Sequence, residues 1–220
     1  RLTDDPDEPN KYIFPTNTTL AAGAYLRLFA DGPNGTSDIH LGFSLDQEGE
    51  VVYLFDKASN GGALIDFVEF GNQLPNLSIG RLLSGNWGLC TPTFGSANIA
   101  APTGSPATLA INEWLASGTF PFVDDFIEIY NPDSLPVDLG GFYFTDHPIG
   151  QPARHRIPLL HFIPGFSYQA FIADGNPDNG ALHLNFQLAG EGGEIGLFAP
   201  DLTLIDCVYY GQQRTGISQG

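Results

Sequence analysis

Leu182-His183-Leu184-Asn185-Phe186-Gln187-Leu188 carries an apolar side chain at every second position, and Ile39-His40-Leu41-Gly42-Phe43-Ser44-Leu45 shows the same pattern earlier in the chain. In an extended strand, side chains two residues apart point to the same face. The apolar residues of each stretch therefore share one face, and polar or small residues occupy the other. Each stretch predicts a half-buried β-strand, and its recurrence predicts a repeated structural unit.

The repeat extends in both directions from these two stretches. The further matched pairs are Thr3-Asp4 with Thr145-Asp146, Ile13-Phe14-Pro15 with Arg156-Ile157-Pro158, 25–32 with 168–175, Leu54-Phe55 with Leu197-Phe198, 64–68 with 204–208, and 78–80 with 218–220. Turn-forming residues follow the alternating stretch in both copies, at 46–49 and 189–192,. We therefore expect a repeated β-hairpin, which joins the alternating stretch to the strand that ends at Phe55 or Phe198.

The composition favours an all-β fold. Gly (27) and Pro (17) interrupt the chain too often for long helices, and the apolar runs between them are short,. Phe (17) and Tyr (8) supply the bulk that a β core buries,. Together with the repeat, this composition predicts two β modules in tandem. We place the first module at 1–101, a linker with Pro, Gly, Ser and Ala at 102–108, and the second module at 109–220,.

Each copy of the repeat lacks one end. The strand-like stretches 109–114 and 125–132 precede the repeated part of the second copy and have no counterpart in the first. The stretch 81–95 follows the repeated part of the first copy and has no counterpart in the second. The simplest account is a window on a longer array, in which the first module lacks its opening strands and the second lacks its closing strand.

The order of motifs resembles that of a lamin-tail domain. The stretches that carry the resemblance are Ile111-Asn112-Glu113, 126–132, 137–142 and Thr145-Asp146, then 171–175, 183–188 and 204–206, with the closing motif at 78–95. The resemblance implies that each module is an immunoglobulin-like β-sandwich. It also implies a binding or architectural module of the kind attached to secreted or surface proteins of bacteria, without catalytic residues.

The charge balance bears on partners and location. The chain has 8 Lys and Arg against 25 Asp and Glu, a formal net charge of −17, and 82–153 contains neither Lys nor Arg. Nucleic acids and anionic membranes gain affinity through Lys and Arg, so neither is an expected partner. The apolar runs are shorter than the roughly 20 residues of a membrane-spanning helix, so no membrane insertion is expected. An acidic surface poor in Lys favours an extracellular or cell-surface location.

An acidic loop near the N-terminus is the candidate metal site. Asp4, Asp5, Asp7 and Glu8 lie close together in sequence, and calcium takes several oxygen ligands from a flexible loop,. The spacing does not match the helix-loop-helix calcium pattern, and the corresponding loop of the second copy, 147–150, has no acidic residue. A solvated acidic loop is the alternative. Calcium is the one cofactor that the sequence suggests.

His40 and His183 occupy equivalent positions of the repeat. Neither has a second His or Cys at a metal-ligand spacing, so we favour a histidine that is hydrogen-bonded to the backbone at a strand end. The sequence has no local Cys or His signature of a hydrolase,. We therefore expect no catalytic residue and predict that the chain is not an enzyme.

Phe120 and Phe122 are the candidate interaction residues. They flank Pro121 in the loop between Gly118 and Asp125, where two aromatic rings are unusual unless something covers them,. We expect this pair to contact a neighbouring module or a partner.

The sequence as a whole predicts a structural or adhesive module of a secreted or cell-surface repeat protein, with a fibre or sheath subunit as one form. Its partners would be other copies of itself or neighbouring modules, which it contacts through strands and loops. The alternative is an accessory binding module of a large secreted enzyme whose catalytic domain lies elsewhere in the polypeptide.

Overall fold

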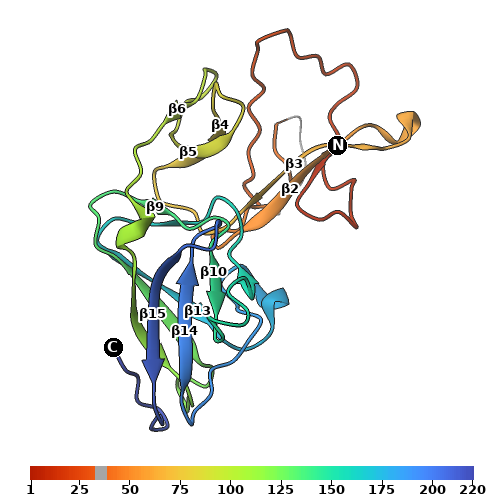
Figure 1. The fold of residues 1–220 in the computed structure, drawn as a ribbon. Helices are drawn as coiled ribbons and strands as arrows, with labels where there is room; N and C mark the ends of the chain where they lie inside the picture. Colours follow the sequence, from red (N-terminus) through yellow and green to blue (C-terminus); the bar gives the residue numbers. More distant parts are fainter. Residues whose placement is uncertain (33–38) are drawn as a thin grey trace. The chain divides into compact units, whose positions relative to one another are not determined.

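The computed structural model describes residues 1–32 and 39–220, which divide into two compact units. The first unit consists of Arg1–Phe70 and Pro75–Ala101, and the second consists of Gly71–Leu74 and Pro102–Gly220. Antiparallel strands dominate both units (Figure 1). Single turns of 3-10 helix occur at Ala58–Asn60, Pro106–Thr108 and Pro177–Asn179. The prediction of an all-β chain is confirmed.

The second unit contains strands β7 to β15. Their bounds are β7 Ala110–Leu115, β8 Phe126–Asn131, β9 Val137–Asp138, β10 Tyr143–Thr145, β11 His155–Arg156, β12 Phe162–Ile163, β13 Ser167–Ile172, β14 Gly193–Phe198 and β15 Leu204–Tyr210. One sheet has the order β11-β10-β14-β15, another has the order β13-β8-β7, and β12 pairs with β9. The hairpin of β14 and β15 forms the two blue arrows of Figure 1.

The two larger sheets of the second unit form one hydrophobic core together. Ile127 and Ile129 of β8 are fully buried, whereas the residues on either side of them are less buried, because alternate side chains of a strand face opposite sides,. The ring centroids of Phe171 in β13 and Phe144 in β10 lie 4.8 Å apart, so side chains from both sheets meet in the same cluster. This is a sandwich-like packing of two β layers.

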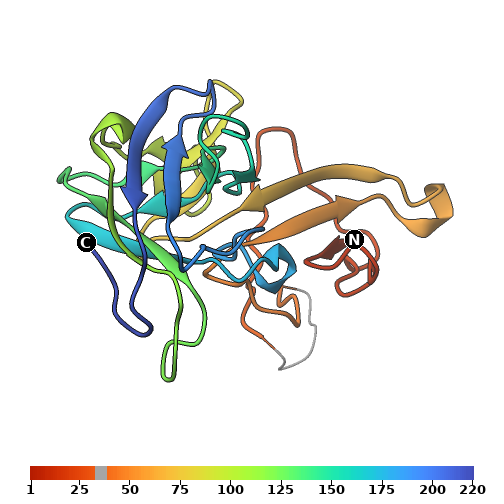
Figure 2. The same cartoon turned by 60° about the horizontal axis from the view of Figure 1, so that its bottom comes forward.

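The first unit contains strands β1 to β6. Their bounds are β1 Leu2–Thr3, β2 Glu50–Phe55, β3 Leu64–Phe70, β4 Ser78–Arg81, β5 Trp87–Thr91 and β6 Ile99–Ala100. They form two sheets, β1-β2-β3 and β4-β5-β6, and Figure 2 shows β2 and β3 as a long twisted hairpin in orange. A small cluster of Tyr12, Leu41 and Phe43 is buried in this unit.

The two copies of the sequence repeat form the same sheet in the same register, since β1-β2-β3 corresponds to β10-β14-β15. The corresponding residue pairs are Leu2–Leu54 and Phe144–Leu197, then Leu54–Asp66 and Leu197–Asp206. A register shift follows Leu54 in one copy and Leu197 in the other. Left-handed backbone also recurs at matched positions, at Asn17 and Leu160, Gly62 and Leu202, and Asn76 and Gly216. The assignment of both units to the immunoglobulin-like class stays a prediction.

The alternating stretches at 39–45 and 182–188 are not regular strands, so the hairpins that we predicted from them are wrong. In place of a ladder, 39–45 has two isolated bridges, Phe29–His40 and Asp31–Ser44, and 182–188 has one, Ile172–His183. The hairpins instead join β2 to β3 and β14 to β15.

The physical reason is that burial and backbone hydrogen bonding separate in these stretches. Leu184, Phe186 and Leu188 are buried, as the alternation predicts. The backbone, however, is bonded outside any ladder, because the Leu188 N–H donates to the carboxylate of Asp125 at 3.0 Å. Periodicity therefore identified the buried face of 182–188 but not its hydrogen-bonding partners, and in 39–45 only Leu41 and Phe43 of that face are buried,.

Candidate interaction surface

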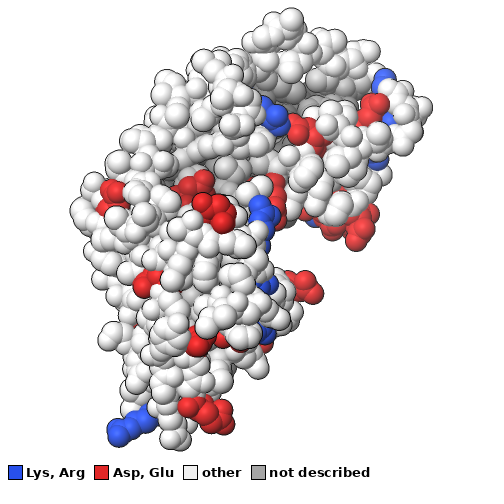
Figure 3. Space-filling view, in the orientation of Figure 1, with Lys and Arg blue, Asp and Glu red and all other residues white. Residues whose placement is uncertain are grey.

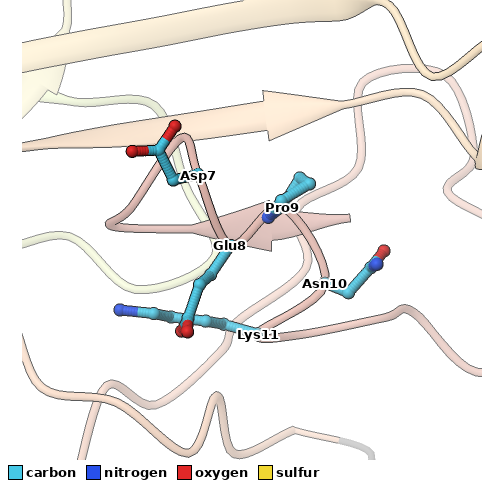
Figure 4. Close-up of a pocket in the computed structure, with 5 residues that line it drawn as sticks. All are labelled: Asp7, Glu8, Pro9, Asn10 and Lys11. Carbon is cyan, nitrogen blue, oxygen red and sulfur yellow. The ribbon is translucent and has the colours of Figure 1, made fainter.

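The four acidic residues of the candidate calcium site do not converge. Asp4 pairs with Lys11 at 2.9 Å between Oδ1 and Nζ, and this hydrogen bond raises the pKa of Lys11 above its ordinary value. Asp5 accepts a hydrogen bond from the N–H of Asp7 through Oδ1 and so closes a turn,. Figure 4 shows the Asp7 side chain pointing away from those of Glu8 and Lys11.

The ion pair of Asp4 recurs in the second copy. Asp146 matches Asp4 in the repeat, and its carboxylate pairs with Arg154, which occupies the place of Lys11. Among the described residues, no group of three or more His, Cys, Asp or Glu side chains gathers closely enough to hold a metal. The contacts of Asp4 are those of a repeated ion pair, and the two alternatives for this loop, calcium binding and a solvated acidic loop, both stay predictions.

The two equivalent histidines pair with carboxylates rather than with the backbone, which corrects our expectation. His183 Nδ1 lies 2.8 Å from Asp174 Oδ2, and His40 Nδ1 lies 2.5 Å from Asp31 Oδ2. Partial burial raises the pKa of Asp174, but hydrogen bonds from the Asn176 N–H, Asn179 and His183 outweigh it and hold the pKa below its ordinary value,. The pair closes the 174–183 loop.

His161 is a buried histidine that the sequence did not single out. It is fully buried, its ring stacks on Phe171 at 5.4 Å between centroids, and its Nδ1 accepts a hydrogen bond from the Asn72 N–H at 3.2 Å. Burial lowers the pKa of His161 to about 4, so the ring is neutral near pH 7. A side chain on Gly71 would collide with the imidazole, so this contact requires glycine. No sequence pattern links residues so far apart.

The segment Gly71–Leu74 follows β3 of the first unit but belongs to the second. The Gly71 N–H donates to the Leu159 carbonyl at 2.9 Å, and the Phe162 N–H donates to the Asn72 carbonyl at 3.2 Å. The Asn72 side chain also donates to Gln169 Oε1 at 3.0 Å. Backbone and side-chain hydrogen bonds thus fasten this short segment.

Phe120 and Phe122 stand at the exposed tip of the loop between β7 and β8. Their side chains are 87% and 66% exposed. The base of the loop is fastened, because the Ser117 N–H donates to Asp125 Oδ1 at 2.8 Å and the Gly216 N–H donates to the Ser117 carbonyl at 3.0 Å. An anchored loop that presents two bare rings suits contact with a partner, which stays a prediction.

The first unit exposes apolar residues whose counterparts in the second unit are buried. Leu45 is 46% exposed, whereas its counterpart Leu188 is 6% exposed. Val52 and Leu54 are half-buried, while the matching residues of β14 are fully buried. Val52 and Leu54 border a groove of about 150 Å³, and the residues that line it are Leu2, Val52, Leu54, Asp66, Phe67, Val68 and Trp87. We call this groove, together with the sheet residues that border it, the open face.

Acidic side chains are scattered over the surface rather than gathered in one patch, as the face drawn in Figure 3 shows. Many of them form local turns, in which a carboxylate accepts a hydrogen bond from the N–H two residues further on. These residues are Asp5, Asp46, Asp133, Asp138, Asp174 and Asp201. Part of the negative charge of the chain therefore comes from carboxylates that stabilise turns.

The described residues contain no helix that is long and apolar enough to cross a membrane. No protein-family model, curated protein or solved structure gives a significant match to the chain.

Proposed function

We propose that this chain is a non-catalytic structural or adhesive part of a secreted or cell-surface repeat protein, built from lamin-tail-like, immunoglobulin-like modules in tandem. The observation that carries the proposal is the recurrence of one three-stranded sheet, with the same register and the same bulge, in both units. Tandem modules present several similar surfaces on one polypeptide, and linked weak contacts then act together as avidity.

The use of the acidic residues supports a role without catalysis. Carboxylates that cleave or transfer groups must converge on a substrate, with pKa values set apart by their surroundings. In this chain Asp4 and Asp146 sit in equivalent ion pairs, and Asp125 and Asp206 accept hydrogen bonds from backbone N–H groups. These are stabilising contacts of loops and strands.

The proposal is tested by the mass of the protein in solution across a wide range of concentration. We expect association that grows with concentration, because the bare rings of Phe120 and Phe122 lose their exposure to water in a contact,. Phe120→Ser and Phe122→Ser are expected to weaken association. Leu83→Ser is the matched control, since Leu83 is 96% exposed and lies in the first unit. A chain that stays monomeric throughout contradicts self-assembly.

The anchored aromatic tip also suits the second candidate function, an accessory binding module of a large secreted enzyme. Two rings on a fastened loop can contact a ligand as well as a neighbouring module. The reading frame around this chain separates the two functions. Further β modules on both sides support the array, and a neighbouring domain with a catalytic motif supports the accessory role.

A further inference from the structure

The second unit covers its repeated sheet with one β-hairpin, formed by β7 and β8. β8 pairs with β13 along the whole strand. β7 pairs on its other side with the C-terminal segment, because Trp114 and Gln219 exchange backbone hydrogen bonds of 2.8 and 2.9 Å. Ile127 and Ile129 of this hairpin are fully buried in the core. The hairpin therefore fills the space between β13 and the C-terminal segment.

The first unit has the counterparts of both neighbours of that hairpin. The segment 25–30 corresponds to β13, and Ile79 in β4 corresponds to Gln219. Within the described part of the chain, 25–30 carries one isolated bridge, through Phe29, and its Tyr25 and Leu26 side chains are exposed. β4 is an edge strand, since it pairs with β5 alone. Two strand edges are thus left without the partners that their counterparts have.

The open face lies where the hairpin would pack. Val52 and Leu54 border the groove, and their counterparts in β14 are fully buried in the core to which Ile127 and Ile129 of the hairpin also belong. The carboxylates of Asp206 and Asp66, which match in the repeat, also differ in whether a backbone N–H of a covering strand bonds to them. Asp206 Oδ2 accepts a hydrogen bond from the Ile111 N–H of β7 at 2.8 Å, whereas the matching Asp66 Oδ2 accepts one from the exposed Arg81 side chain.

We propose that the first unit binds a two-stranded β-hairpin with the pattern of 110–131, which inserts between 25–30 and β4 and covers the open face. Main-chain hydrogen bonds along both edges and apolar side chains in the groove supply the interaction. The repeat also sets the register. A residue in the place of Ile127 lies opposite Leu28, and one in the place of Trp114 lies opposite Ile79.

The occupant is a hairpin in the polypeptide immediately before β1. In the second unit the hairpin precedes β10, which is the counterpart of β1, and the segment 132–142 with the two-residue strand β9 joins them. A second copy of the chain is a poor donor, because its own hairpin is buried in its own core. This inference deepens the proposed function as part of an array. It rests on that function in one respect, because it requires a hairpin of this kind before β1 in the polypeptide.

The test adds a copy of residues 109–142 directly before Arg1 of the full chain. We expect backbone amides of 25–30 and β4 to exchange at least about tenfold more slowly with solvent deuterium than in the unextended chain, since paired edges open less often. The matched control is the same extension with Ile127→Asp and Ile129→Asp, which keeps the length but loses the apolar face. Val52→Asp in the first unit is expected to abolish the protection, and the exposed Leu83→Asp is expected to keep it.

Equal exchange in the chains with the apolar and the aspartate-bearing extensions overturns the proposal. Protection that rises with protein concentration also overturns it, because the hairpin then comes from another molecule. The mass measurement of the proposed function uses the unextended chain, so the two failures are distinguishable. If the extension protects the amides but the unextended chain stays monomeric, the hairpin site is supported and only the proposed self-assembly is contradicted.

Discussion

Leu54 and Leu197 occupy the same position in the repeated sheet and differ in what covers them, so replacing each with alanine measures the effect of the cover. Leu197 is fully buried in the core of the second unit. We expect Leu197→Ala to lower the free energy of unfolding of that unit by about 3 kcal/mol, because apolar contacts are lost and a cavity remains. Leu54 is half-buried beside a groove, so Leu54→Ala creates little new empty space. We expect it to cost about 1 kcal/mol.

The two tryptophans allow each unit to be followed separately, since Trp87 lies in the first unit and Trp114 in the second. Trp114→Phe leaves Trp87 as the reporter of the first unit, and Trp87→Phe leaves Trp114 as the reporter of the second. Denaturant unfolding followed by fluorescence then gives the free energy for each alanine variant in its own background. Leu83→Ala is the surface control and is expected to change stability by less than about 0.5 kcal/mol,.

Equal losses at the two positions would refute the reasoning, since they would mean that Leu54 is covered as fully as Leu197. The hairpin extension provides a second check. In the extended chain the cost of Leu54→Ala is expected to rise towards that of Leu197→Ala, because the groove is then closed.

Three further predictions concern charged and titratable groups. The pKa of buried His161 is lowered to about 4, below that of an unfolded histidine, so the unfolded chain binds more protons between these values,. The free energy of unfolding of the second unit is therefore expected to fall by up to about 3 kcal/mol as the pH falls from about 6.5 to about 4. Unfolding followed by Trp114 fluorescence measures this change. If His161→Gln shows the same pH dependence, His161 is not its origin. Asp174→Ala removes the acceptor of several hydrogen bonds and is expected to destabilise the second unit by about 1 to 2 kcal/mol in denaturant unfolding, more than the matched Asp31→Ala destabilises the first,. Because Asp4 and Asp5 are already engaged, adding calcium or a chelator is expected to leave the thermal midpoint unchanged by calorimetry. If calcium instead raises the thermal midpoint, and Asp5→Asn and Asp7→Asn abolish this rise, the loop is a metal site.

Two kinds of contact account for what could not be predicted about the candidate sites: local pairs with several possible partners, and contacts between residues far apart in the chain. The pairing of Asp4 with Lys11 and of His183 with Asp174 involves residues near each other in the chain, yet charge and spacing left several partners open for each. The contact of His161 with Asn72 joins residues that share no motif. Exposure of Phe120 and Phe122 depends on how the base of their loop is fastened, and the Gly216 N–H that bonds to it comes from the far end of the chain.

The sequence by itself determined the all-β class, the repeat and the buried side of the stretch 182–188, because these depend on residue type and on local spacing. Tertiary structure alone decided which stretches became strands and which faces were covered. Residues 182–188 have the period of a strand, but the N–H groups of Asn185 and Leu188 donate to the side chains of His155 and Asp125. Leu54 and Leu197 carry the same side chain at the same place in the repeat, yet only Leu197 is fully buried, in a core to which several elements contribute. Burial is a property of the neighbours that folding brings together, and those neighbours lie far away in the chain.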